Sequence, residues 1–99
     1  AAEIRPYESV HVWNVTRGTR LETYAIAGLH GSQDICANGA AAHLIRPGDQ
    51  VILASYAMIA EEAVDQHCPK LIFVDQSNRI THCGPELAGP QRRSTANGC

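Results

Sequence analysis

At residues 14–26 the sequence reads NVTRGTRLETYAI, a glycine-containing turn that runs into a stretch with strand character. Side chains of a strand alternate between its two faces, so Arg20, Glu22 and Tyr24 share one face while Thr23 lies on the other. An Arg guanidinium can hold a carboxylate through two parallel hydrogen bonds, and a Tyr hydroxyl nearby can donate a proton. In isolation the same pattern is more typical of a solvent-exposed strand face. The surrounding sequence has to decide between these two interpretations.

The residues around this stretch predict a mainly β domain. Val10 and Val12 alternate with His11 and Trp13, which predicts a strand at 10–15, joined by a turn to a second strand at 20–27 in an antiparallel hairpin. Further strands are expected at 33–37, 50–58, 70–75 and 79–82. The run at 50–58 is apolar enough to be mostly buried. Short helices are expected at 38–43 and 59–67.

These elements favour one β-rich barrel with one or two short helices, spanning residues 1–83. The remainder, 84–99, is rich in Gly, Pro and polar residues, and we expect it to be a disordered tail. The chain does not begin with Met, and its apolar start has no helix cap ahead of it. We therefore expect the N-terminal strands of the domain to precede Ala1.

Composition narrows the possible partners of this domain. With 99 residues and a net charge of −2, the chain is one small domain whose core would gain stability from oligomerisation. Its Lys and Arg residues are scattered, which argues against a nucleic-acid surface. The longest apolar runs, 51–54 and 71–74, are too short to cross a bilayer, and we expect a soluble, cytoplasmic protein. The four cysteines form no C-x-x-C pair, so no metal site is expected.

A second candidate site lies at Asn38, Gly39, Ala40 and Ala41. The Asn-Gly step suits a tight turn, and the small side chains that follow let a ligand approach the backbone. The first amide groups of a helical turn lack partners and attract anions. Close packing of the alanines against a neighbouring strand is the simpler explanation, and both interpretations stay open at this point.

Three motifs in this order resemble the pyruvoyl-dependent aspartate 1-decarboxylase family. They read Trp13-Asn14-Val15-Thr16-x-Gly18-x-Arg20-x-x-Thr23-Tyr24-x-Ile26, then Asn38-Gly39-Ala40-Ala41-Ala42, then Gly48-Asp49-x-Val51-Ile52. The resemblance runs from about Ile4 to Glu62 without a large gap. It implies a double-psi β-barrel, a homotetramer with active sites between neighbouring subunits, and conversion of L-aspartate to β-alanine for pantothenate biosynthesis. It also implies a covalent pyruvoyl cofactor that forms a Schiff base with the substrate amine.

The resemblance also implies roles for individual residues. Arg20 would hold a substrate carboxylate, Tyr24 would be the proton donor, and Thr23 would assist self-cleavage of the precursor. Trp13 and the turn Asn38-Gly39-Ala40-Ala41 would line the pocket. Thr23 and Tyr24 are adjacent, so they should face opposite ways in a regular strand. A site built between subunits, or a local bulge, would reconcile their two roles.

This sequence departs from the family pattern at its start. In the family the precursor cleaves itself at a Gly-Ser bond, and the serine becomes the pyruvoyl group at the start of the larger chain. Neither Ser9 nor Ser32 matches that serine, so we expect it upstream of Ala1, with the cleaved N-terminal β chain as a partner. Without that segment the chain should be inactive. It is either a trimmed enzyme, which we favour, or a decayed, non-catalytic barrel that binds a small carboxylate or a partner protein.

Overall fold

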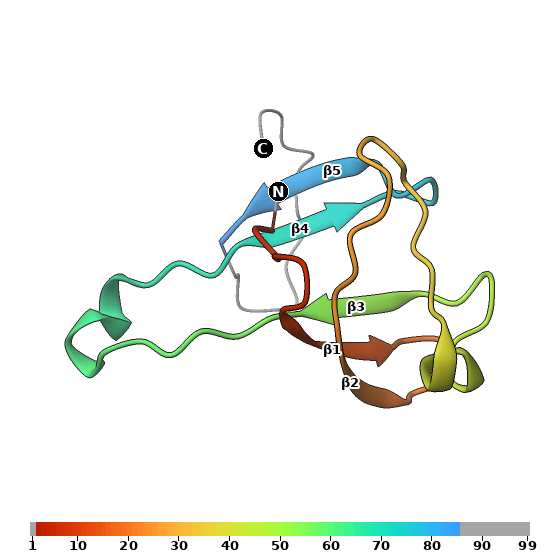
Figure 1. Cartoon of the computed structure of the whole chain (residues 1–99). Helices are drawn as coiled ribbons and strands as arrows, with labels where there is room; N and C mark the ends of the chain where they lie inside the picture. The colour runs from red at the N-terminus through yellow and green to blue at the C-terminus, as the bar shows by residue number, and fades with distance from the viewer. Residues whose placement is uncertain (1, 86–99) are drawn as a thin grey trace. The chain divides into compact units, whose positions relative to one another are not determined.

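The structure, a computed structural model, describes residues 2–85 and consists mainly of β-strands (Figure 1). Its elements in chain order are β1 (Ser9–Asn14), β2 (Arg20–Tyr24), the 3₁₀ helix η1 (Gly39–His43), β3 (Val51–Ala54), the 3₁₀ helix η2 (Glu61–Gln66), β4 (Leu71–Val74) and β5 (Ile80–Gly84). Residues 4–57 form one compact unit, and the other described residues belong to a second. The prediction of a mainly β fold with one or two short helices is confirmed. The double-psi barrel stays a prediction from the resemblance.

The first unit is built on a three-stranded antiparallel sheet with the order β2-β1-β3. In this sheet β1 is central, with Val12 paired to Leu21 of β2 and to Leu53 of β3. Val10 and Val12 are buried, and Asn14 lies on the same face of β1, as the alternation predicts. The expected hairpin of β1 and β2 is therefore confirmed.

The second unit contains an antiparallel hairpin of β4 and β5. This hairpin agrees with the strands expected at 70–75 and 79–82. Asp75 closes the turn at 75–79, because its carboxylate accepts the backbone N–H groups of Arg79 and Ser77. These two hydrogen bonds lower the pKa of the Asp75 carboxyl. The predicted tail begins at residue 84, the last residue of β5, and beyond Pro85 it lies outside the described residues.

Three expected elements differ from the structure. The run at 50–58 forms only the four-residue edge strand β3, with Ile52 and Leu53 exposed by 49% and 43% in this chain, so the expectation of a long, mostly buried strand was wrong. Residues 33–37 form no strand. At the start of this segment the Ser32 hydroxyl accepts the backbone N–H of Asp34, a local bond that competes with strand pairing there. The helix expected at 59–67 is the shorter η2, which has no side-chain cap and buries no residue.

Among residues 2–85 there is no helix long and apolar enough to cross a membrane.

Candidate functional site

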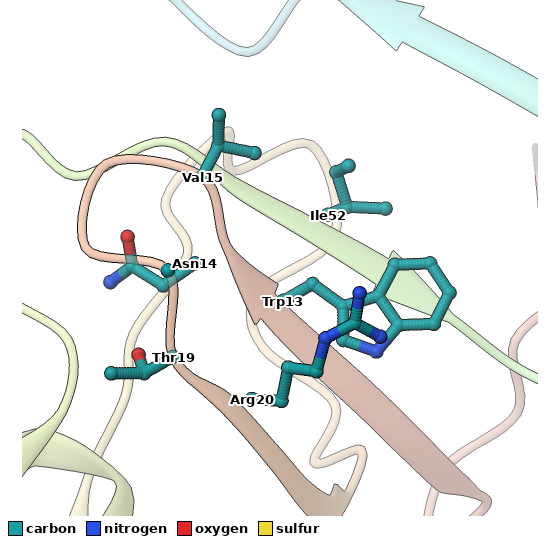
Figure 2. A pocket seen from close by; sticks show the side chains of 7 residues that line it. Trp13, Asn14, Val15, Thr19, Arg20 and Ile52 are labelled. Carbon is teal, nitrogen blue, oxygen red and sulfur yellow. The ribbon is translucent and has the colours of Figure 1, made fainter.

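A small pocket of about 230 Å³ lies where the turn joins β1 to β2 (Figure 2). Trp13 and Arg20 face each other across the two strands as register partners. The guanidinium carbon of Arg20 lies 5.1 Å from the centroid of the Trp13 ring, a cation–π distance. Figure 2 shows the Arg20 guanidinium over the Trp13 ring, with the Ile52 side chain of β3 near the indole. The complete lining is Trp13, Asn14, Val15, Gly18, Thr19, Arg20 and Ile52.

The turn that forms one wall of this pocket depends on Gly18. Its φ is 75°, in the left-handed region that glycine adopts without steric cost. The backbone N–H of Gly18 donates to the carbonyl of Asn14 at 2.8 Å, and the N–H of Asn14 donates to the carbonyl of Thr19, also at 2.8 Å. These two bonds close the hairpin directly before Arg20. The turn residues therefore determine where the Arg20 side chain leaves the backbone.

Asn14 connects this turn to the rest of the unit. Its side chain is buried, with the whole residue 3% exposed. Its Nδ2 donates to the carbonyl of Leu44 at 3.1 Å and to Oδ2 of Asp49 at 2.8 Å, while its Oδ1 accepts the backbone N–H of Arg17 at 3.0 Å. A buried amide with all these partners satisfied is a rigid anchor, because losing any one of them leaves a polar group without a partner. Asn14 thus fixes the turn against η1, which Leu44 terminates.

Asp49 accepts three hydrogen bonds through one oxygen, and its side chain is only 4% exposed. Oδ2 receives the Nε of Arg17 at 2.7 Å and the backbone N–H of Arg46 at 3.0 Å, besides Nδ2 of Asn14. The bond from Arg17, followed by those from Asn14 and Arg46, lowers the pKa of Asp49 from 3.8 to about 2. The residues Asn14, Arg17, Arg46 and Asp49 are called the Asp49 cluster below.

The Asp49 cluster predicts a pH dependence of stability. A carboxyl group with a depressed pKa in the folded state adds stability that is complete above its unfolded pKa of 3.8 and is lost as the pH falls towards about 2. We expect the thermal midpoint of Asp49→Asn to lie below that of the parent at pH 6, and this gap to narrow between pH 4 and pH 2. Thermal unfolding followed by circular dichroism over this range measures it. The control is Asp34→Asn, a change at an exposed aspartate of the same unit; a gap that stays constant with pH would contradict the assignment.

Sequence reasoning did not identify the Asp49 cluster as part of the site. The available signal was the turn motif Arg46-Pro47-Gly48-Asp49, whose Asp carries an acceptor side chain that is common in turns. Its contact with Asn14, 35 residues earlier in the chain, depends on the pairing of β1 with β3. Ile52 enters the pocket for the same reason, because the register places it opposite Trp13. Within residues 2–85, no group of three or more His, Cys, Asp or Glu side chains is placed to hold a metal ion.

Tyr24 and Thr23 lie at the far end of β2 from Arg20. Tyr24 pairs with Ser9 and shares the face of Arg20 and Trp13, whereas Thr23 pairs with Val10 on the buried face. The pairing of β1 with β2 runs without a register shift, so the bulge suggested as one explanation for their two roles does not occur in this hairpin. The alternative, a site shared between subunits, stays a prediction.

The residues Asn38, Gly39, Ala40 and Ala41 form the start of η1. Asn38 has an extended backbone and makes no side-chain capping bond, and Gly39 has a φ of 60°, which glycine accommodates. None of the four is among the residues that line the pocket at Arg20. The helix η1 is linked to the pocket at its other end, where Asn14, a pocket residue, donates a hydrogen bond to the carbonyl of Leu44.

Comparisons with known proteins all point to the aspartate decarboxylases. The family model described as aspartate decarboxylase matches residues 1–81. The aspartate 1-decarboxylase of Rhodopirellula baltica is 68% identical over 97 residues, which cover 98% of this chain and 62% of that protein. That of Legionella pneumophila (strain Lens) is 57% identical over 94% of this chain and 70% of its own length. That of Myxococcus xanthus is 55% identical over 95% of this chain and 73% of its own length. The chain thus spans less than two thirds of the Rhodopirellula protein.

Proposed function

This chain belongs to the aspartate decarboxylase family, and from that premise we propose that it is the larger chain of a pyruvoyl-dependent aspartate 1-decarboxylase. The enzyme would convert L-aspartate to β-alanine, as a carboxy-lyase in pantothenate biosynthesis. One observation supports this assignment most directly. The Arg20 guanidinium lies over the Trp13 indole in the pocket at the hairpin turn, where it can receive a carboxylate.

In this proposal Arg20 binds the substrate carboxylate that is retained. A planar guanidinium can donate two parallel hydrogen bonds to one carboxylate, and the Trp13 ring restrains its orientation. The carboxylate that departs as carbon dioxide should not be the one held by Arg20. A strong ion pair with the departing group would stabilise the ground state more than the transition state and slow the reaction.

Tyr24 would protonate the carbon that loses carbon dioxide. Its hydroxyl group is a general acid on the same face of the hairpin as Arg20, and it is accessible because Tyr24 is 56% exposed in this chain. Thr23, on the opposite face, would assist self-cleavage of the precursor instead. The backbone N–H groups at Asn38, Gly39, Ala40 and Ala41 would contribute further donors for an anionic substrate.

The residues of the pocket fit a reactive carbonyl cofactor. None of the residues that line it carries a primary amine or a thiol, the two side-chain nucleophiles that would compete with the substrate amine for a ketone. Trp13 and Tyr24 are the residues of this chain that would hold a pyruvoyl group derived from a serine upstream of Ala1. Its chemical contribution is an electron-withdrawing carbonyl that accepts the electron pair released with carbon dioxide. Substrate orientation and proton delivery remain the work of Arg20 and Tyr24.

Further features of the family are part of the same proposal. The pocket would be completed by the enzyme's own cleaved N-terminal β chain and by a neighbouring subunit of a cytoplasmic homotetramer. The exposure of Ile52 and Leu53 on the edge strand β3 supports a covering surface at this position, because an open strand edge with apolar side chains promotes association. A site between subunits would also allow Thr23 and Tyr24 to act from opposite faces of β2.

The proposal is tested by expressing the gene product with its upstream segment beside the 99-residue chain. We expect the longer protein to cleave itself, to gain the mass signature of a pyruvoyl group and to form β-alanine from L-aspartate. The 99-residue chain should form none, because no amino-acid side chain supplies the required carbonyl. A precursor with its cleavage-site serine replaced by alanine is the matched control.

Each outcome of this experiment discriminates between the two candidate functions. β-Alanine from the 99-residue chain alone would rule out the pyruvoyl assignment. Binding of aspartate by the self-cleaved protein without any product would favour the non-catalytic binding module.

A further inference from the structure

Tyr7 has a backbone conformation that an aromatic residue rarely adopts. Its φ is 66°, in the left-handed region where the Cβ of a bulky side chain crowds the backbone. Burial does not offset this cost, because Tyr7 is 77% exposed. A strained residue persists only where the surrounding structure determines its conformation, and such residues gather at functional sites. The structure therefore has to contain something that holds Tyr7 in place.

Hydrogen bonds to the chain before and after Tyr7 hold its backbone in this conformation. The N–H of Tyr7 donates to the carbonyl of Ala25 at 2.6 Å, and the N–H of Ala25 donates to the carbonyl of Glu8 at 2.9 Å. These bonds extend the pairing of β1 and β2 beyond the ends of both strands. On the other side, Glu8 closes a tight turn with Arg5, since its N–H donates to the Arg5 carbonyl at 3.1 Å and its Oε1 accepts the Arg5 N–H at 3.0 Å.

The consequence of this strained turn is a contact between two tyrosine rings. The ring of Tyr7 lies against that of Tyr24, with centroids 6.4 Å apart and planes inclined at 37°. This is within the range of favourable aromatic pairs. Tyr24 ends β2 and is directly followed by Ala25, the residue to which Tyr7 is bonded. The turn therefore places the Tyr7 ring beside a side chain that would otherwise project from the strand end into open space.

We propose that Tyr7 is a positioning residue for Tyr24, restricting the rotation of its ring so that the phenol hydroxyl is presented in one orientation. The inference rests on the proposed function, in which Tyr24 donates the proton. A proton donor works only within hydrogen-bond reach of the atom that it protonates, and a side chain free to change rotamer spends much of its time out of reach. The ring contact supplies this restriction, and the hydroxyl of Tyr7 has no part in it.

The contact is tested with two substitutions in the full-length, self-cleaved enzyme. Tyr7→Asn removes the ring but suits the backbone, because asparagine tolerates the left-handed region. Tyr7→Phe keeps the ring and removes only the hydroxyl. We expect Tyr7→Asn to lower kcat roughly tenfold, within the ~10²-fold that a misplaced catalytic group can cost, with KM for L-aspartate unchanged. KM is spared because Arg20 lies at the other end of β2.

The Phe variant separates positioning from general stability. Tyr7→Phe should keep the parent kcat, since both rings can pack against Tyr24. Equal kcat values for parent and Tyr7→Asn, or a parallel loss in both variants, would overturn the proposal.

A second readout does not depend on activity. With 3-fluorotyrosine incorporated, the ¹⁹F signal of Tyr24 is assigned by its loss in Tyr24→Phe. We expect this signal to keep its chemical shift in Tyr7→Phe and to shift and sharpen in Tyr7→Asn, as the Tyr24 ring gains freedom. An unchanged Tyr24 signal in Tyr7→Asn would show that Tyr7 does not orient it. Failure of the proposed function is distinguishable, because a parent enzyme inactive on aspartate would still give this fluorine result.

Discussion

The Arg20→Lys variant is expected to need far more L-aspartate for half-saturation than the parent enzyme. One charge-assisted hydrogen bond is worth about 1.5–3 kcal/mol, so loss of one of the two bonds should raise KM roughly 10- to 150-fold. Lysine keeps the positive charge but is a point charge, and it cannot reproduce the planar pair of bonds. It also cannot lie flat over the Trp13 ring as the guanidinium does at 5.1 Å. Steady-state kinetics on the self-cleaved enzyme measures the change.

The fold should survive this substitution, because Arg20 is exposed at the start of β2. Circular dichroism reports on the fold, whereas the fluorescence of Trp13 would also respond to the lost contact with Arg20. Arg46→Lys is the matched control, since the hydrogen bond from Arg46 to Asp49 comes from its backbone and is kept. A KM for Arg20→Lys as low as that of Arg46→Lys would contradict a role of Arg20 in binding the carboxylate.

Replacing Tyr24 by Phe is expected to affect turnover rather than binding. The substitution removes one oxygen and leaves the ring, so the packing against Tyr7 is retained. General acid catalysis contributes about 10²–10⁴-fold, and kcat should fall by a factor in that range with KM little changed. β-Alanine formation under saturating aspartate is the measurement, with intact mass verifying that the variant has cleaved itself.

The control for this variant is Tyr56→Phe. Tyr56 belongs to the same unit, is exposed, and packs edge-on against His11 with ring centroids 5.1 Å apart. Its substitution removes the same atom from a residue that does not line the pocket, and kcat should stay at the parent value. A self-cleaved Tyr24→Phe enzyme that turned over as fast as Tyr56→Phe would mean that another group delivers the proton.

The hairpin of β1 and β2 was predictable because its signals are local. The alternation placed Val10 and Val12 on one face of the strand, which the structure buries together with Asn14, and Gly18 marked the turn that the structure contains. The placement of Arg20 and Tyr24 on one face followed from strand geometry alone. Trp13 entered the candidate site through the family resemblance, and its contact with Arg20 follows from the register of the hairpin.

The features that sequence reasoning missed are non-local or depend on backbone geometry. Asp49 reaches Asn14 only because β3 pairs with β1, and strand order could not be derived from periodicity. The run at 50–58 looked like one long strand because apolar content does not show where a partner strand ends. The left-handed conformation of Tyr7 has no sequence signal of its own, since its neighbours impose it.

The scarcity of buried side chains in this chain has a consequence for any measurement of its stability. Among residues 2–85 only Val10, Val12 and Asn14 are buried as whole residues, while large apolar side chains such as Leu29 and Met58 remain exposed. When a partner surface covers those side chains, folding and association become one equilibrium, and mass action makes the unfolding midpoint depend on protein concentration. A substitution at an apolar surface position then acts through subunit affinity. For the proposed homotetramer, melting temperatures are therefore comparable only between samples of equal protein concentration.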